Sequence, residues 1–135
     1  MNYRSKVAGV DKVDSMTGKK FEIWLEHQFA KAGYKVKRTR YQKDHGADLI
    51  VTKPDGTKIA VQAKQSSKRN ARAGAKTLGE VLRGKDYYNC DEAMMVTNRG
   101  YTQQAKDEAR RIGIKLMSRK ELIEFVEMPI ARKNN

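Results

Sequence analysis

The stretch Tyr41–Lys64 reads YQKDHGADLIVTKPDGTKIAVQAK and predicts two β-strands joined by a tight turn. In the turn, Pro54 suits a position that needs φ of about −65°, and Gly56 suits one that needs a positive φ. The flanking segments 47–51 and 58–64 are rich in β-branched and apolar residues, as strands are. The sequence therefore predicts a β-hairpin around which the rest of the chain is arranged.

The predicted hairpin brings three polar side chains to one patch. Side chains alternate between the two faces of a strand, so Gln62 and Lys64 share the face opposite the apolar one. A turn centred near Asp55 pairs Asp48 with Gln62, within one residue. Apolar neighbours on both sides of Asp48 predict a buried carboxylate, whose cost a cation, either Lys64 or a metal, would offset. The alternative is a solvated Asp48 near the turn and a solvated Lys64 at the end of an edge strand.

The whole chain bounds the class of protein. Its 135 residues suit a single domain with a real core. No apolar run approaches the roughly 18 residues that span a membrane, and residues 1–16 lack the apolar segment of a signal peptide. The single cysteine, Cys90, excludes an internal disulfide and a cysteine-based zinc site, and it favours a reducing cytoplasm.

Charge is the strongest compositional signal. The chain has 29 Lys and Arg against 16 Asp and Glu, for a formal net charge of +13. Such a balance favours a polyanionic partner, and nucleic acid ahead of an anionic membrane. A membrane-binding protein would need a basic amphipathic helix with bulky apolar residues, and none stands out. We therefore expect a nucleic-acid partner and no membrane.

Two segments carry basic residues without apolar anchors. Residues 1–16 predict a basic arm that is at best partly ordered, and residues 65–76 predict a surface loop over which a nucleic-acid backbone could lie. Between this arm and a polar tail at 128–135, residues 17–127 predict one domain. The side chains that we expect to contact DNA are Arg4, Lys6, Lys68, Arg69, Arg72 and Lys76.

Capping residues and periodicity predict the remaining elements. They are a helix, an edge strand, a second helix, a buried parallel strand, a third helix, a last strand and a final helix. Their bounds are 17–33, 34–41, 78–88, 93–97, 102–113, 114–117 and 118–129. Thr17, Thr102 and Ser118 are the expected N-caps, and Ser118 forms a capping box with Glu121. The order αβββαβαβα predicts an α/β fold with a central mixed sheet flanked by helices.

Glutamate and histidine side chains outside the hairpin are weaker candidates for the site. Glu22 lies next to the apolar stripe of the first helix, and the residues leave open whether it faces solvent or the hairpin. His45 is a lone loop histidine between Asp44 and Gly46, and His27 lies on a helix, so no histidine cluster for a metal is expected.

A series of short motifs in order resembles the catalytic domain of Mrr-type restriction endonucleases, members of the PD-(D/E)XK nuclease superfamily. The resemblance covers about residues 17–125 and extends into the second half of that domain. The matching residues are Thr17-Gly18 with Phe21-Glu22, Gly33–Val36, Gly46–Leu49, Val61–Lys64, and then Val96–Asn98, Tyr101-Thr102, Ala105 and Ile114–Leu116.

The resemblance implies a restriction-endonuclease-like fold and a role for each matched polar residue. Asp48 would hold a divalent metal, Mg²⁺ with Mn²⁺ as a substitute, and Gln62 would occupy the second ligand position of the superfamily. Lys64 would orient or help to deprotonate the attacking water, and Glu22 would complete the site as an outer metal ligand. Because Gln62 carries no charge where the superfamily has an acid, one metal is favoured over two.

The resemblance has one departure. Mrr-type restriction enzymes carry a separate DNA-recognition domain, and residues 1–135 show none, so structure-selective or non-specific cutting is expected rather than sequence-specific restriction. The rival enzyme is a Holliday-junction resolvase of the same superfamily, which acts as a dimer on branched DNA. Two rival functions involve no catalysis: a non-cleaving nucleic-acid-binding module and a basic subunit of a larger assembly. Cutting of both strands leads us to expect a homodimer.

Overall fold

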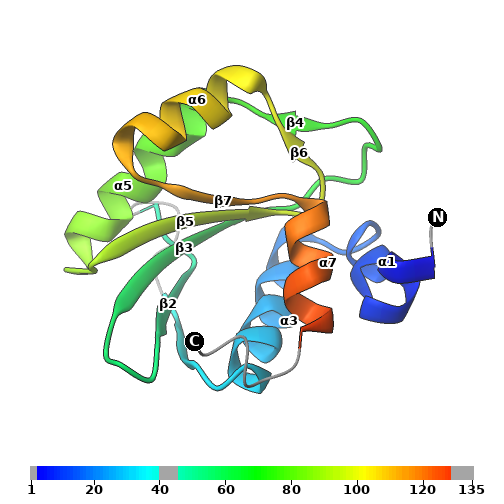
Figure 1. The fold of residues 1–135 in the computed structure, drawn as a ribbon, viewed down its shortest axis with the longest axis horizontal. Coiled ribbons are helices and arrows are strands. Elements are labelled where there is room, and N and C mark those ends of the chain that lie inside the picture. The colour runs from blue at the N-terminus through cyan, green and yellow to red at the C-terminus, as the bar shows by residue number, and fades with distance from the viewer. Residues whose placement is uncertain (1–2, 40–45, 129–135) are drawn as a thin grey trace.

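The protein is described by a computed structural model over residues 3–39 and 46–128, and a five-stranded mixed sheet lies at its centre (Figure 1). The strand order is β1-β2-β3-β5-β7. The first three strands pair antiparallel, and β3, β5 and β7 pair parallel, which confirms the predicted mixed sheet. The bounds are β1 Lys35–Arg38, β2 Leu49–Thr52, β3 Lys58–Lys64, β5 Glu92–Thr97 and β7 Lys115–Met117.

The hairpin has the predicted register. Leu49 on β2 lies opposite Val61 on β3, and the N–H of Asp48, the residue just before β2, donates to the same Val61 at its carbonyl, at 2.8 Å, so Asp48 lies within one residue of Gln62 in the register. The turn closes where Gly56 N–H donates to the carbonyl of Lys53 at 2.9 Å, and Gly56 has the expected positive φ of 93°. The turn chemistry thereby fixes which residues meet at the far end of the hairpin.

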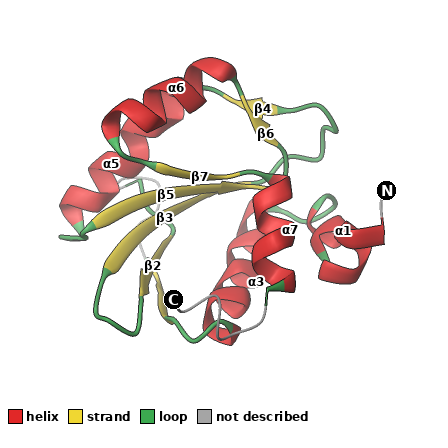
Figure 2. Cartoon of the chain, in the orientation of Figure 1, coloured by secondary structure: helices red, strands yellow, loops and turns green. Residues whose placement is uncertain are grey.

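Helices cover both faces of the sheet. The helices α3 (Gly18–Lys31) and α7 (Arg119–Glu127) lie on one face, and α5 (Leu78–Tyr87) and α6 (Gln103–Ile112) lie on the other (Figures 1 and 2). Side chains along β5 alternate between the two faces of the sheet, so Val96 packs in the hydrophobic core on one face and Met95 in the core on the other. No helix in the described ranges is long and apolar enough to cross a membrane.

The predicted helix caps are present. The Thr17 side chain accepts from Lys20 N–H at 3.2 Å, and Thr102 does the same for Ala105 N–H at 3.1 Å. Ser118 and Glu121 form the predicted capping box. Each cap contributes about 1 kcal/mol, so these local signals were strong enough to mark the helix starts in the sequence.

Two regions differ from the prediction. Residues 3–13 form α1 (Tyr3–Ala8) and α2 (Val10–Val13), so the expectation of at most partial order in this arm was wrong. Such short helices show no periodicity, and burial of Val10 and Val13 in the first core orders them instead. The 65–76 loop contains β4 (Arg72–Ala73), paired with β6 (Gly100–Tyr101), and runs into the 3₁₀ turn η1 (Ala75–Thr77). Tyr41, His45 and residues 129–135 lie outside the described residues.

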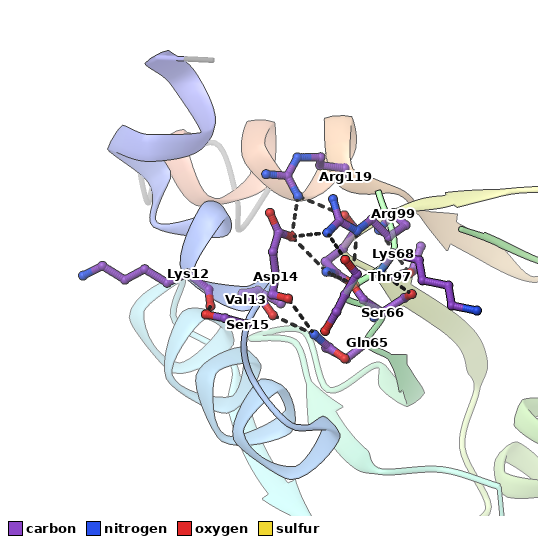
Figure 3. Close-up of polar contacts among 12 residues, drawn as sticks. Lys12, Val13, Asp14, Ser15, Gln65, Ser66, Lys68, Thr97, Arg99 and Arg119 are labelled. Carbon is purple, nitrogen blue, oxygen red and sulfur yellow. Dashed lines mark hydrogen bonds and ion pairs between the residues drawn. The ribbon is translucent and has the colours of Figure 1, made fainter. Parts of the chain in front are cut away.

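A polar cluster fastens the N-terminal helices to the domain (Figure 3). Asp14, just after α2, accepts through Oδ1 from Arg119 Nη1 at 2.8 Å and from Asn98 Nδ2 at 3.0 Å. The guanidinium of Arg99 lies 3.5 Å from the same oxygen. The Arg99 side chain is only 10% exposed, so Asp14 supplies the counter-charge of a largely buried cation.

The same cluster holds the chain that leaves β3. Asn98 accepts from Ser66 N–H at 2.9 Å and donates to the Ser66 carbonyl at 2.8 Å. Arg99 Nε also donates to the Ser66 carbonyl, at 3.0 Å. The segment that follows Lys64 is therefore anchored to the end of β5, and through Asp14 to the start of α7.

Replacing Asp14 with alanine should lower the free energy of unfolding by about 3 kcal/mol, because it leaves Arg99 and Arg119 without their shared carboxylate. Urea denaturation followed by circular dichroism would measure the change. Asp11→Ala is the matched control, since Asp11 Oδ1 is buried and has no hydrogen-bond partner in the described part of the chain. That variant should match or exceed wild type in stability, and equal stabilities for the two variants would contradict the role of Asp14.

Candidate active site

Asp48 sits where three segments meet at the polar end of the hairpin. Its carbonyl accepts from Thr39 N–H at 3.0 Å, and its N–H donates to the Val61 carbonyl at 2.8 Å. Its carboxylate Oδ2 accepts from Ala63 N–H at 2.7 Å. The residue is 9% exposed, so the predicted burial of Asp48 is confirmed.

The surroundings of Asp48 do not suit a free carboxylate. Burial raises the pKa of Asp48, and this effect outweighs the Ala63 hydrogen bond and the Lys64 charge, which both lower it. The negative charge of Glu80 raises the pKa further. An ionised Asp48 therefore needs more positive charge than Lys64 alone supplies.

Gln62 and Lys64 point from β3 to one common partner, Glu80. Gln62 Nε2 donates to Glu80 Oε2 at 2.7 Å, and Lys64 Nζ lies 3.4 Å from the same oxygen. The Lys64 and Glu80 side chains are 38% and 39% exposed, so their ion pair contributes little to stability. The arrangement instead fixes where the amide and the ammonium lie.

Glu80 is the site residue that sequence reasoning missed. It lies in the first turn of α5, where a glutamate ordinarily complements the helix dipole, so nothing local marks it. The available signal was indirect: Gln62 removes a negative charge from the superfamily pattern, and Glu80 is the first acid after Lys64 in the chain.

A close backbone contact joins the Asp48 segment to α5. Gly46 has φ of 76°, and a β-carbon built on it would lie 1.8 Å from the Glu80 carbonyl oxygen. Only glycine allows this approach. The contact places the first turn of α5, and with it Glu80, beside the segment that carries Asp48.

The oxygen atoms at this site fit a hard divalent cation. Gln62 is 7% exposed, and its Oε1 is buried without a hydrogen-bond partner among the described residues. The Asp48 carboxylate, whose Oδ2 accepts from Ala63 N–H at 2.7 Å, adds charged oxygen atoms at the same end of the hairpin. Mg²⁺ prefers such oxygen ligands and completes its shell with water and phosphate.

The site is not a ready-made metal cage. Across residues 3–39 and 46–128, no three His, Cys, Asp or Glu side chains are grouped so that they could hold a metal ion. The predicted ligand set has only two carboxylates, Asp48 and Glu22, so it is not of that kind. Glu22 is buried on α3, a helix that packs against β2 and β3, and its place in the site stays a prediction.

The basic residues of the 65–76 segment are all exposed, as a contact with a nucleic-acid backbone requires. They are Lys68, Arg69, Arg72 and Lys76. On the N-terminal helix, Lys6 is exposed, and Arg4 pairs with Glu127 at 3.2 Å. This ion pair competes with phosphate for Arg4, and DNA contact by any of the six residues stays a prediction.

A mixed sheet with an antiparallel hairpin that carries Asp48, Gln62 and Lys64 at its polar end defines a restriction-endonuclease-like fold. The sequence profile of the restriction endonuclease family Mrr_cat matches residues 13–126. The chain belongs to this family, which confirms the resemblance found in its sequence.

Solved structures agree with this fold. The DNA modification-dependent restriction endonuclease AspBHI has a TM-score of 0.71 and 15% identity, over 93% of this chain and 35% of that one. The MspJI restriction endonuclease, in complex with a 27-mer oligonucleotide, has a TM-score of 0.60 and 18% identity, over 90% and 31%. The protein of unknown function AF1548 has a TM-score of 0.65 and 19% identity, over 78% and 62%.

At these identities the likeness concerns the fold. This chain spans 62% of the length of AF1548 and about a third of the two restriction enzymes. A comparison with curated proteins gave no match.

Proposed function

We propose that the chain is a metal-dependent DNA endonuclease that hydrolyses phosphodiester bonds, with Mg²⁺ as the metal and Mn²⁺ as a substitute. The observation that carries the proposal is that three groups gather at one end of the hairpin: the buried carboxylate of Asp48, the ammonium of Lys64, and a buried amide oxygen of Gln62 that has no hydrogen-bond partner among the described residues. Membership of a restriction endonuclease family and a net charge of +13 support DNA as the substrate.

Each side chain has a distinct part in the proposed reaction. Asp48 and Gln62 would hold the metal through their oxygens, with Glu22 as an outer ligand. Bound there, the metal would lower the pKa of a coordinated water and offset charge on the phosphate. Lys64, held in place by Glu80, would orient the attacking water and stabilise the negative charge that develops on the scissile phosphate.

DNA would approach over the segment that follows β3. Asn98 and Arg99 hold the backbone of Ser66. The segment that carries the exposed basic residues therefore begins at a fixed position, two residues after Lys64. Backbone contacts of this kind position the duplex and carry no sequence information.

We propose residues 17–127 as the nuclease domain, with residues 1–16 adding phosphate contacts and 128–135 as a tail. We also propose a homodimer that acts in the cytoplasm.

The test is cleavage of supercoiled plasmid and of a four-way junction, with Mg²⁺ and with EDTA. Wild type should cut only with the metal, and Lys64→Ala should cut at least about a hundredfold more slowly. Lys58→Ala, which removes the same charge from the other end of β3, should cut like wild type. The preferred substrate separates a general endonuclease from a resolvase. Binding of both substrates without cutting would reject the proposal in favour of a binding module.

A further inference from the structure

The hydrogen bond between Gln62 and Glu80 decides which way the Gln62 amide faces. An ionised carboxylate only accepts hydrogen bonds, so the group that Gln62 presents to Glu80 must be its NH₂. The distance of 2.7 Å from Nε2 to Glu80 Oε2 is that of a strong, charge-assisted bond. A reversed amide would bring two oxygens together at this distance. Glu80 therefore excludes the alternative orientation.

The orientation of the amide matters because it determines which atom, the oxygen or the nitrogen, lies on the side away from Glu80. With Nε2 committed to Glu80, Oε1 is buried and has no donor within the described part of the chain. A buried acceptor without a partner costs about 1–3 kcal/mol. Such a cost persists at a site where the atom has a ligand to receive, and an amide oxygen at the same end of the hairpin as a buried carboxylate, Asp48, suits a cation.

We propose that Glu80 is a positioning residue: it locks the Gln62 amide so that Oε1, rather than Nε2, faces the bound metal. Through its hydrogen bond to Gln62, Glu80 also supplies the negative charge that the Gln62 amide itself lacks. Its carboxylate polarises the amide and makes Oε1 a better ligand, as the hydrogen-bond partners of metal ligands do. The same Oε2 holds Lys64 Nζ at 3.4 Å, so one carboxylate orients both polar residues of β3.

The inference rests on the metal of the proposed function but can be tested without DNA cleavage. Mn²⁺ binding to the folded chain would be titrated by electron paramagnetic resonance. The proteins compared are wild type, Glu80→Ala, Glu80→Gln, Gln62→Ala and the variant that combines Glu80→Ala with Gln62→Ala. Asp86→Ala is the matched control, because it removes the same charge from the opposite end of α5, away from Gln62.

Loss of a hydrogen-bond partner behind a metal ligand typically weakens metal binding by about 10–100-fold. Glu80→Ala should therefore bind Mn²⁺ about 10–100-fold more weakly than wild type, and Asp86→Ala should bind it equally well. If Glu80 acts through Gln62, adding Glu80→Ala to Gln62→Ala should weaken binding by no more than about twofold. Glu80→Gln should keep much of the affinity, because its amide oxygen can still accept from Gln62 Nε2.

Three outcomes would overturn the role assigned to Glu80. They are unchanged Mn²⁺ affinity in Glu80→Ala, a full additional loss in the Gln62→Ala background, and no Mn²⁺ binding by wild type. Failure of the proposed function alone looks different: wild type would bind Mn²⁺, the variants would follow the pattern above, and DNA would stay uncut. A thermal denaturation curve for each variant verifies that the titrated protein is folded.

Discussion

Replacing Asp48 with asparagine should abolish metal-dependent cleavage and, at the same time, make the metal-free protein more stable. Asparagine keeps an oxygen that can accept from Ala63 N–H, so the local backbone contact survives. What is lost is the charge that would hold the metal, and we expect cleavage to fall by at least about a hundredfold, or about 2.7 kcal/mol in the barrier. What is gained is relief from burying that charge.

The gain in stability should depend on pH with a definite sign. Burial raises the pKa of Asp48 in the folded chain, so the folded state holds its proton more tightly than the unfolded state does. Stability from this group is therefore lost as the pH rises from the unfolded value, about 3.9, through the raised pKa. The advantage of Asp48→Asn should be absent below about pH 3.9 and complete above the raised pKa.

Thermal denaturation of the metal-free proteins across this pH range would measure the difference. Asp55→Asn is the matched control, because it lies in the turn of the same hairpin and its pKa is shifted the other way. The backbone N–H of Thr57 donates to Asp55 at 2.9 Å and lowers the pKa of that carboxyl. Asp55→Asn should lose a little stability at neutral pH and keep its cleavage activity. If Asp48→Asn is less stable than wild type, the Asp48 carboxylate stabilises the metal-free fold. Its burial would then not be a cost that a bound cation offsets.

The Tm of wild type and of Asp48→Asn, measured with and without Mg²⁺, provides a second test. The metal should raise the Tm of wild type, because it binds the folded chain and offsets the buried charge. It should leave the Tm of Asp48→Asn nearly unchanged. A burial cost that a bound ion removes is what distinguishes a functional carboxylate from a structural one.

The sequence was sufficient for those parts of the fold that local chemistry determines. Pro54 and Gly56 define the turn, and the turn sets the register that brings Asp48 within one residue of Gln62. Thr17 and Thr102 mark helix starts because each supplies an acceptor to an otherwise unpaired N–H. The fold and three polar residues of the candidate site follow from these signals and the resemblance.

The parts that sequence could not supply all depend on contacts between distant residues. Asp14 meets Arg119 across 105 positions, and no periodicity predicts such a pair. Two-residue strands such as β4 leave no alternation to detect. Glu80 reads as an ordinary helix-start glutamate, and it joins the site only because α5 packs against the segment that carries Asp48.

That packing leads to the largest expected loss of stability, in Gly46→Ala. The variant combines two costs: about 1–2 kcal/mol for a side chain at φ of 76°, and about 1–3 kcal/mol for forcing a methyl group into an occupied space. The atom in the way is the Glu80 carbonyl oxygen, 1.8 Å from the new β-carbon. It belongs to the backbone of a helix, so relief requires α5 itself to move.

Gly46→Ala should therefore lose about 3 kcal/mol or more and about 10 °C in Tm. Gly56→Ala separates the two costs, because Gly56 has φ of 93° but nothing within 4 Å of a built β-carbon, so it should lose only about 1–2 kcal/mol. Mn²⁺ titration then tests the link to function. A displaced α5 carries Glu80 away from Gln62, so folded Gly46→Ala should bind Mn²⁺ more weakly than Gly56→Ala does. Equal stability and equal affinity in the two variants would show that Gly46 does not position Glu80.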